Sequence, residues 1–256
     1  MRQLNAGNYF IRAMNMRYMS VSQYKAFNAC EAAALAEIKG RYRREETTSL
    51  LVGSYVDAFY EGTLDAFRAT HPQIFKRDGE LKSDYIQANE IIARTMRDRY
   101  FTKLMSGEKQ VIMTGKIAGV DVKIKIDSLR PDMIVDLKVI KDFDDLTLDD
   151  RGRLPFFEAW RYDMQGAVYQ EIVRQNTGKK LPFVLACATK EKVTAIDAVE
   201  IEQHSLDFCL DEFAAAIPGF DAIKKGIIKP ERCEKCDFCK ETRKLKKPTL
   251  SGEFYL

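Results

Sequence analysis

The sequence has no long apolar run, and this absence argues against a membrane-spanning helix. No stretch approaches the roughly 18 consecutive apolar residues that a bilayer span requires, and MRQLNAGNYF at the start lacks the apolar block of a signal peptide. We therefore expect a cytoplasmic protein with no membrane partner. Repeats and low-complexity tracts are also missing, and 256 residues, 46% of them hydrophobic, suffice for one sizeable core. We expect a single domain over 1–256, with a helical leader over about 1–48 and a Cys-rich basic segment over about 229–256.

A strong excess of charge of one sign is also missing. The 41 Lys and Arg residues against 38 Asp and Glu give a net charge of +3, which is too small to indicate a nucleic-acid partner by itself. Residues 229–247 hold eight basic against four acidic residues, and could be a solvated terminus or help to hold a phosphate backbone. Residues 141–158 reverse this balance and predict an exposed loop between a core strand and a core helix, either merely solvated or gating a substrate channel.

Two carboxylates and one ammonium group are spaced so that they can meet at one point. The run VDVKIKID (120–127) alternates apolar and polar residues, which predicts a half-buried strand ending at Asp127. MIVDLKVI (133–140) predicts the next strand, and RPD between them predicts a turn. Asp136 and Lys138 then project from one face and can lie beside Asp127. Such a set can bind a divalent ion, although a strand-end Asp can also cap a turn and an Asp-x-Lys pair can be a solvated salt bridge.

The elements predicted around this set follow the order helix, three strands, helix, strand. Their expected ranges are 51–62 for the first helix, 109–113, 120–127 and 133–140 for the strands, 156–175 for the second helix and 182–189 for the last strand. In this order, with an acid followed by D-x-K on the next strand, the chain resembles the PD-(D/E)XK nuclease superfamily. The resemblance implies an α/β (α+β) fold with a restriction-endonuclease-like core, a central mixed β-sheet flanked by helices. It also implies that Asp127, Asp136 and Lys138 are catalytic.

Tyr162, Gln165 and Tyr169 lie along one stripe of the second predicted helix. Such a stripe could be the polar edge of a packed helix. Its Q-x-x-x-Y spacing after D-x-K is also similar to the extra motif of the RecB-type branch of the superfamily. That similarity implies that these side chains contact the DNA backbone near the metal site.

The segment GSYVDA resembles the G-x-x-x-H-A segment that precedes the core in RecB-like and RecE-like nucleases. Asp57 stands where those families usually have a histidine metal ligand, and a carboxylate oxygen suits Mg²⁺ or Mn²⁺. Asp57 could equally be a surface residue. Gly53, one turn earlier, is expected to let this helix approach the sheet closely. The stretch YMSVSQYKAFNACEAAALAEIKG resembles the leader of the same group, with Ser20 or Ser22 capping a helix that Gly40 ends.

The six cysteines fall into two kinds, and none is expected to form a disulfide in a cytoplasmic chain. Cys187 and Cys209 lie in apolar patterns and are expected to be small core residues. Cys233, Cys236 and Cys239, in CEKCDFC, have the short spacing that converges thiolates on one metal. A closed site needs a fourth ligand.

Cys30 is the candidate that the resemblance supplies. RecB-type nucleases with iron–sulfur clusters have one cysteine before the nuclease core and three after it, although their last two are usually spaced more widely than here. His204 and Cys209 are the alternatives. The resemblance therefore favours a 4Fe-4S cluster over Zn²⁺, although both can use the same four thiolates and the thiols could also be uncoordinated. With a metal, the role would be structural, joining the C-terminal segment to the first helix.

The nearest group that the sequence resembles is the phage or prophage RecE-like exonucleases, of the exodeoxyribonuclease VIII type. This implies a Mg²⁺- or Mn²⁺-dependent hydrolase acting at double-stranded DNA ends in recombination or repair, beside a single-strand annealing recombinase and as a homo-oligomer. Asp57, Asp127, Asp136 and the Leu137 carbonyl would hold the metal, and Lys138 would orient the attacking water. Two alternatives stay open: a RecB-like nuclease acting on single strands or flaps, and a catalytically silent DNA-binding module.

Overall fold

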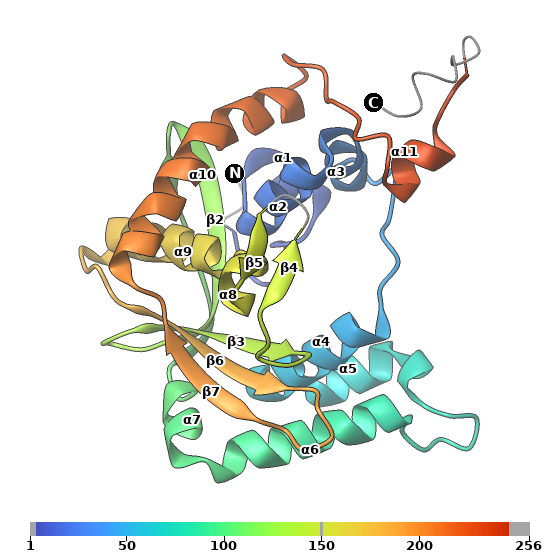
Figure 1. The fold of residues 1–256 in the computed structure, drawn as a ribbon, viewed down its shortest axis with the longest axis vertical. Helices are drawn as coiled ribbons and strands as arrows, with labels where there is room; N and C mark the ends of the chain where they lie inside the picture. Colours follow the sequence, from blue (N-terminus) through green and yellow to red (C-terminus); the bar gives the residue numbers. More distant parts are fainter. Residues whose placement is uncertain (1–3, 149–150, 246–256) are drawn as a thin grey trace.

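The centre of the protein is a mixed β-sheet with helices on both faces (Figure 1). The computed structural model describes residues 4–148 and 151–245. Within these residues the sheet has five strands in the order β1-β2-β3-β6-β7, and only β3 and β6 run parallel. The strands are β1 (Glu108–Ile117), β2 (Val120–Leu129), β3 (Ile134–Ile140), β6 (Phe183–Thr189) and β7 (Ile196–Glu200). The expected mixed sheet flanked by helices is confirmed.

The helices form two layers, one on each face of the sheet. Helices α4, α6 and α7 pack on one face, whereas α2, α3, α9 and α10 pack on the other (Figure 1). The helical elements are α1 (Arg12–Arg17), α2 (Val21–Ala29), α3 (Glu31–Ile38), α4 (Thr48–Glu61), α5 (Leu64–Thr70), the 3-10 turn η1 (Pro72–Ile74), α6 (Ser83–Arg97), α7 (Arg99–Leu104), α8 (Phe156–Ala159), α9 (Tyr162–Thr177), α10 (Gln203–Lys224) and α11 (Asp237–Glu241). The parallel pair β3 and β6 is joined across the sheet by α8 and α9, as such pairs require.

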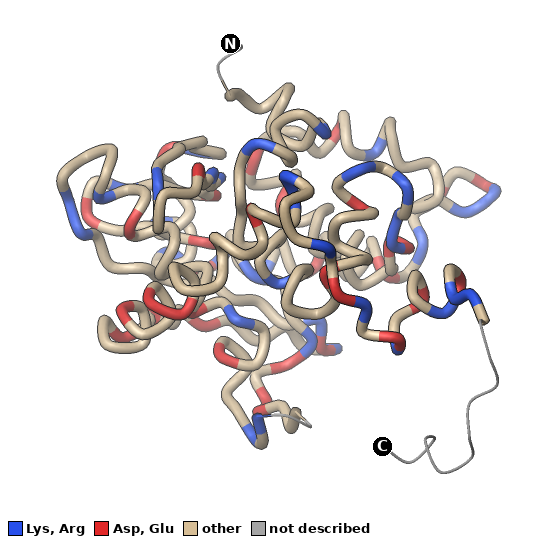
Figure 2. The backbone as a smooth tube through the Cα atoms, turned by 90° about the horizontal axis from the view of Figure 1, so that it is seen from above, with Lys and Arg blue, Asp and Glu red and all other residues tan. Residues whose placement is uncertain are grey.

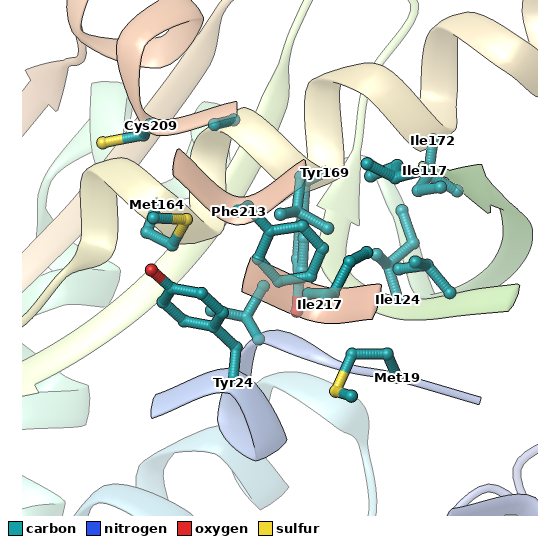
Figure 3. Packing of buried hydrophobic residues seen from close by; sticks show 14 of the residues in the cluster. Met19, Tyr24, Ile117, Ile124, Met164, Tyr169, Ile172, Cys209, Phe213 and Ile217 are labelled. Carbon is teal, nitrogen blue, oxygen red and sulfur yellow. The ribbon is translucent and has the colours of Figure 1, made fainter. Parts of the chain in front are cut away.

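Alternation along β3 decides which layer each side chain meets. Ile134 and Ile140 belong to the core beneath α9 and α10, whereas Val135 and Leu137 belong to the core beneath α4 and α6. Figure 3 shows part of the first core, where Tyr24, Tyr169 and Phe213 gather. Because side chains repeat with period two, the even-numbered polar residues of β3 face the α9 layer. The candidate site residues Asp136 and Lys138 therefore lie under α9, the helix that follows β3 in the chain.

Two expected helices are each interrupted, and a different residue interrupts each. The helix predicted over 156–175 is divided into α8 and α9 because Arg161 adopts a left-handed conformation, with φ 56° and ψ 43°. In the leader, Ser20 caps α2 by accepting a hydrogen bond from the Gln23 N–H, as expected. That helix does not continue to Gly40, because extended backbone at Cys30 separates α2 from α3. Both interruptions redirect the chain near a candidate site.

The stretch between β3 and α8 is not the simple loop that its composition suggests. It contains a small antiparallel hairpin, β4 (Leu146–Leu148) and β5 (Gly152–Leu154). The positive-φ Gly152 begins β5, and residues 149 and 150 lie outside the described residues. The turn RPD between β2 and β3 forms as expected, with the Arg130 N–H donating to the Met133 carbonyl at 3.0 Å.

Charges of both signs are interspersed over the fold (Figure 2). This agrees with the small net charge of +3. Of the predicted basic segment 229–256, the structure describes the part up to residue 245, so the later lysines lie outside the described residues. Among the described helices, none combines the length and the apolar character needed to cross a membrane.

Candidate active site and cysteine cluster

The candidate active site lies where β2 and β3 separate. These strands pair only at Ser128 with Val135 and at Leu129 with Ile134. Beyond these pairs no backbone hydrogen bonds join the described parts of β2 and β3. A side chain bridges the strands instead, because Asp127 Oδ2 accepts a hydrogen bond from the Leu137 N–H at 2.9 Å. The fork thus positions Asp127 beside the middle of β3.

Asp136 and Lys138 project from the same face of β3 into this fork. Asp136 is 2% exposed, and its Oδ1 accepts a hydrogen bond from Gln165 Nε2 on α9 at 2.6 Å. Its buried Oδ2 is paired with the Lys138 ammonium. The Lys138 ammonium also lies 4.8 Å from the centre of the Tyr162 ring. A buried carboxylate is retained only where it is both hydrogen-bonded and paired with a cation, and Gln165 and Lys138 supply these two contacts to Asp136.

Helix α4 contributes Asp57 from the opposite layer. Asp57 lines a cavity of about 580 Å³ together with Leu137 and Lys138. Gly53 lines the same cavity, and a Cβ placed there would meet nothing within 4 Å. The expectation that Gly53 allows a close approach of helix and sheet is therefore wrong. Gly53 instead leaves open space on the cavity wall.

The pKa values of Asp57 and Asp127 are raised, first by burial and then by neighbouring carboxylates. Burial raises the pKa of Asp57 to about 7, with a further contribution from Asp136 and an opposing one from Lys138. Burial, followed by the charges of Asp136 and Asp57, raises the pKa of Asp127 well above its usual range. For Lys138, burial alone would lower the pKa, but the charges of Asp136 and Asp127 outweigh it and raise the value. The single positive charge of Lys138 thus does not neutralise the negative charge that Asp57, Asp127 and Asp136 would carry when ionised.

A hard divalent cation fits these residues. Asp57, Asp127 and Asp136 offer only oxygen donors, the ligands that Mg²⁺ and Mn²⁺ prefer, and burial together with the neighbouring carboxylates raises the pKa of Asp127. The three carboxylates are not drawn together as a set. In the described part of the chain, the only group of three or more potential ligands with all ligand atoms within 4.8 Å of one another consists of cysteines. The three carboxylates are therefore more widely spaced than the four cysteines.

The stripe on α9 points toward the site residues and their strands. Gln165 donates to Asp136, and the Tyr169 hydroxyl donates to the Lys125 carbonyl on β2 at 2.9 Å. Tyr162 places its ring face near Lys138. In this state the stripe supports the site through contacts within the protein.

Three residues near the site escaped the sequence analysis. Lys25 on α2 donates to the Trp160 carbonyl at 2.6 Å, and burial, followed by the charge of Lys138, lowers its pKa to about 7. Glu61 forms a 3.4 Å ion pair with Lys125. The four-residue spacing of Asp57 and Glu61, which places both on one helical face, could have revealed Glu61. Only tertiary packing brings Lys25 and Trp160 here.

The four cysteines that the sequence singled out lie together. Cys30 Sγ is 3.6 Å from Cys239 Sγ, Cys233 Sγ is 4.0 Å from Cys239 Sγ, and all four sulfurs, including that of Cys236, lie within 4.8 Å of one another. No disulfide joins them, and they could hold a metal ion or cluster. Backbone N–H groups of Lys235 and Cys236 lower the pKa of Cys233 to about 6, which favours a thiolate.

The two alternative fourth ligands, His204 and Cys209, do not join this cluster. Cys209 is 3% exposed in the core beneath α10, and Cys187 is fully buried on β6, as expected of core residues. His204 lies at the start of α10 in an exposed ion pair with Glu202. The cysteine cluster (Cys30, Cys233, Cys236 and Cys239) joins segments 200 residues apart.

Backbone contacts support that junction. The Ala32 N–H donates to the Glu231 carbonyl at 2.9 Å, and the Glu231 N–H donates to Glu31 Oε2 at 2.7 Å. Figure 1 shows α11 beside α3, with the chain between α3 and α4 running down the edge of the molecule. The C-terminal segment is thus attached to the start of α3.

Comparison with known proteins places this geometry in a family. Residues 20–242 match a family described as a PDDEXK-like domain of unknown function (DUF3799). No curated protein matches the chain. A crystal structure described as a "putative exonuclease" from Eubacterium rectale is similar, with a TM-score of 0.95 and 46% sequence identity over 99% of this chain and 98% of that chain. The chain therefore belongs to the PDDEXK-like family DUF3799.

Proposed function

We propose that this protein is a divalent-metal-dependent exodeoxyribonuclease that hydrolyses phosphodiester bonds at double-stranded DNA ends. The observation that carries the proposal is the fork between β2 and β3, where Asp127, Asp136 and Lys138 meet beside a cavity. The similarity to a protein described as an exonuclease supports the same reaction. A binding module has no need of a buried carboxylate and an ammonium group at an open cavity.

Asp57, Asp127, Asp136 and the Leu137 carbonyl would hold the metal. Bound Mg²⁺ or Mn²⁺ supplies activation of water and neutralisation of charge on the phosphate. Lys138 Nζ orients the attacking water and offsets negative charge that develops on the phosphate. A compact ammonium group suits this point charge better than the planar fork of arginine.

Two further residues prepare this arrangement. Gln165 fixes Asp136 through its hydrogen bond to Oδ1, so the other oxygen stays directed at the fork. The Tyr162 ring borders the Lys138 ammonium and limits where that group can move. Both act by holding the reacting groups in place before DNA arrives.

DNA contacts would come from the stripe on α9. Tyr162, Gln165 and Tyr169 would grip the backbone of the strand next to the scissile phosphate. Gln165 and Tyr169 already donate to Asp136 and to the Lys125 carbonyl, so contact with DNA requires them to share or exchange these hydrogen bonds. A role in phage-type recombination or repair, with a single-strand annealing recombinase and a homo-oligomeric assembly, follows from the RecE-like resemblance.

A digestion assay tests the proposed reaction. End-labelled linear duplex, the same duplex closed into a circle, and a single strand of the same sequence are incubated with Mg²⁺ or Mn²⁺, and with a chelator as control. We expect loss of label from the linear duplex only when a divalent ion is present. Preferential digestion of the single strand would favour a RecB-like nuclease. If no substrate is cleaved, a catalytically silent DNA-binding module would be the remaining interpretation.

We further propose that the cysteine cluster is a structural metal centre. Tetrahedral Zn²⁺ with bonds of about 2.3 Å to sulfur separates its sulfurs by about 3.8 Å, close to the 3.6 Å and 4.0 Å found here. The spacing therefore favours a single ion over a 4Fe-4S cluster, which would have to push the sulfurs apart. Metal analysis of anaerobically purified protein distinguishes one zinc from four irons per chain.

A further inference from the structure

Trp160 occupies an unusual place for a large apolar side chain. It is the only tryptophan in the sequence, and it is 53% exposed. It lines the cavity of about 580 Å³ that Asp57 and Lys138 also line, and Tyr162 lies on the same wall. A half-exposed indole on the wall of a candidate catalytic cavity is accessible to whatever enters.

The backbone around Trp160 is held in a fixed and unfavourable shape. Arg161, the next residue, has φ 56°, a conformation disfavoured for residues with a side chain. The Trp160 carbonyl accepts a hydrogen bond from Lys25 at 2.6 Å, and Arg161 Nη2 pairs with Glu212 on α10 at 2.5 Å. Strained backbone that is stabilised from two other helices is characteristic of functional sites. Here its effect is to end α8 at Trp160 and turn the chain beside the cavity.

Charge alone does not explain how a nucleic acid would be held in this cavity. Its acidic lining residues outnumber its basic ones. The carboxylates are Asp57, Asp142, Asp144 and Asp145, and the ammonium groups are Lys138, Lys141 and Lys190. Phosphate contacts normally supply most of the affinity for DNA. Where the lining is more acidic than basic, an uncharged contact would add affinity that these charges do not supply. Stacking of a base on an aromatic ring is such a contact.

The size of the cavity indicates the form of the nucleic acid. A volume of about 580 Å³ is in the range that encloses a small ligand, so it admits a nucleotide or two but not a duplex. A base exposes its face only when it is unpaired or at the very end of a helix. We infer that Trp160 stacks on a base of a strand that enters the active site unpaired. This inference rests on the proposed nuclease function and adds to it the state of the substrate at the site.

The single tryptophan makes stacking directly measurable. The full chain, in chelator so that no cleavage occurs, is titrated with a short oligothymidine while tryptophan fluorescence is followed. We expect saturable quenching, because every change in the signal comes from Trp160. An oligomer of the same length and charge that lacks bases should give little or no quenching. Equal quenching by both oligomers would overturn the inference.

Variants test the same contact during cleavage. Trp160→Ala should raise KM for the end-labelled linear duplex about tenfold, as expected for the loss of one stacked base, whereas Trp160→Phe should stay close to the wild type. Phe208→Ala is the matched control, because Phe208 on α10 is 70% exposed but does not line the cavity. Unchanged KM in Trp160→Ala, with active wild type, would refute stacking and leave the nuclease function standing. A wild type that neither cleaves nor binds DNA would remove both.

Discussion

The candidate active site and the cysteine cluster are built in opposite ways. Asp57, Asp127 and Asp136 come from three elements and are not drawn together as a set, whereas the four cysteine sulfurs lie within 4.8 Å of one another. Burial does not separate them, because Asp136 is buried like Cys30 and Cys239, and Cys233 and Cys236 are half-buried. Access does differ at Asp57, which lines a cavity. In proteins, structural zinc sites hold four converged ligands and catalytic ones keep a position for the substrate. The convergence of the cysteines and the cavity at Asp57 agree with these two descriptions.

Under the two proposed roles, chemistry and stability are assigned to different regions of the protein. At the carboxylate site, burial and mutual repulsion raise the pKa values of Asp57 and Asp127, so the folded chain carries an electrostatic cost there. At the cysteine cluster, Cys30 and the C-terminal segment are joined by hydrogen bonds as well as by sulfur contacts. Substitutions in the first region should therefore affect cleavage, and substitutions in the second should affect folding.

The largest expected effect is the loss of cleavage in Asp136→Asn or Lys138→Ala. Each change removes a charge at the fork and leaves the apolar core unchanged, so we expect activity to fall by several orders of magnitude while the chain still folds. Lys141→Ala is the matched control, because Lys141 lines the same cavity from an exposed position and pairs with Asp142. Full activity in either fork variant, on DNA that the wild type cleaves, would exclude this site from catalysis.

Cys233→Ser should have the converse effect. We expect it to lose the metal and several kcal/mol of stability, because binding energy at a structural site contributes to folding, on the order of 10 kcal/mol for zinc in small domains. Activity per folded molecule should persist at low temperature. Cys209→Ser, at a buried cysteine outside the cluster, should keep the metal. Metal content and thermal melting measure both variants, and equal metal in the two would contradict a cysteine centre.

A smaller effect is expected at Asp57, where the chain departs from the resemblance. If Asp57 holds the metal, Asp57→Ala should raise the Mg²⁺ concentration for half-maximal rate about tenfold or more, and Asp57→His should retain activity better with Mn²⁺. Glu61→Gln, one turn further along α4, should shift the titration less, since Glu61 pairs with Lys125. Identical titrations for the wild type and Asp57→Ala would make Asp57 a non-ligand.

The sheet could be predicted from the sequence because its signals are local. The alternating pattern of β2 and the apolar run of β6 each predict a strand from neighbouring residues alone. The RPD sequence predicts the turn between β2 and β3 in the same way. The grouping of Asp127, Asp136 and Lys138 follows from those strands and the period of two. For the cysteines, spacing grouped three members, and only the resemblance suggested Cys30.

The remaining features depend on packing between distant segments. Nothing in the local pattern of 156–175 shows that Arg161 will adopt a left-handed conformation, since contacts with Lys25 and Glu212 stabilise that corner. The break at Cys30 likewise goes with contacts to a segment 200 residues later. The open space at Gly53 reverses the expectation of close packing, because the glycine faces a cavity rather than the sheet.

The smallest expected effect is a pH dependence of stability that originates at the carboxylate site. Burial and Asp136 raise the pKa of Asp57 to about 7 from its usual 3.8, and Asp127 shifts in the same direction. Between pH 3.8 and about 7 the Asp57 carboxyl group binds more protons in the folded chain than in the unfolded chain. Its contribution to the free energy of unfolding is therefore fully present below the unfolded pKa and is lost as the pH rises through about 7. In chelator, the melting temperature of the wild type should therefore fall between about pH 5 and about pH 8.

Asp57→Asn isolates this contribution because its amide cannot ionise. Its melting temperature should fall less than that of the wild type over the same interval. The difference should be about 2–4 °C for each kcal/mol of stability that the wild type loses through ionisation of Asp57. Mg²⁺ or Mn²⁺ should stabilise the wild type more at the higher pH, where protons no longer compete for the carboxylates. Two outcomes would contradict this prediction: parallel pH profiles for the two proteins, or stronger stabilisation by the ion at the lower pH. Either would show that the carboxylate site carries no electrostatic cost, and the contrast with the cysteine cluster would then fail.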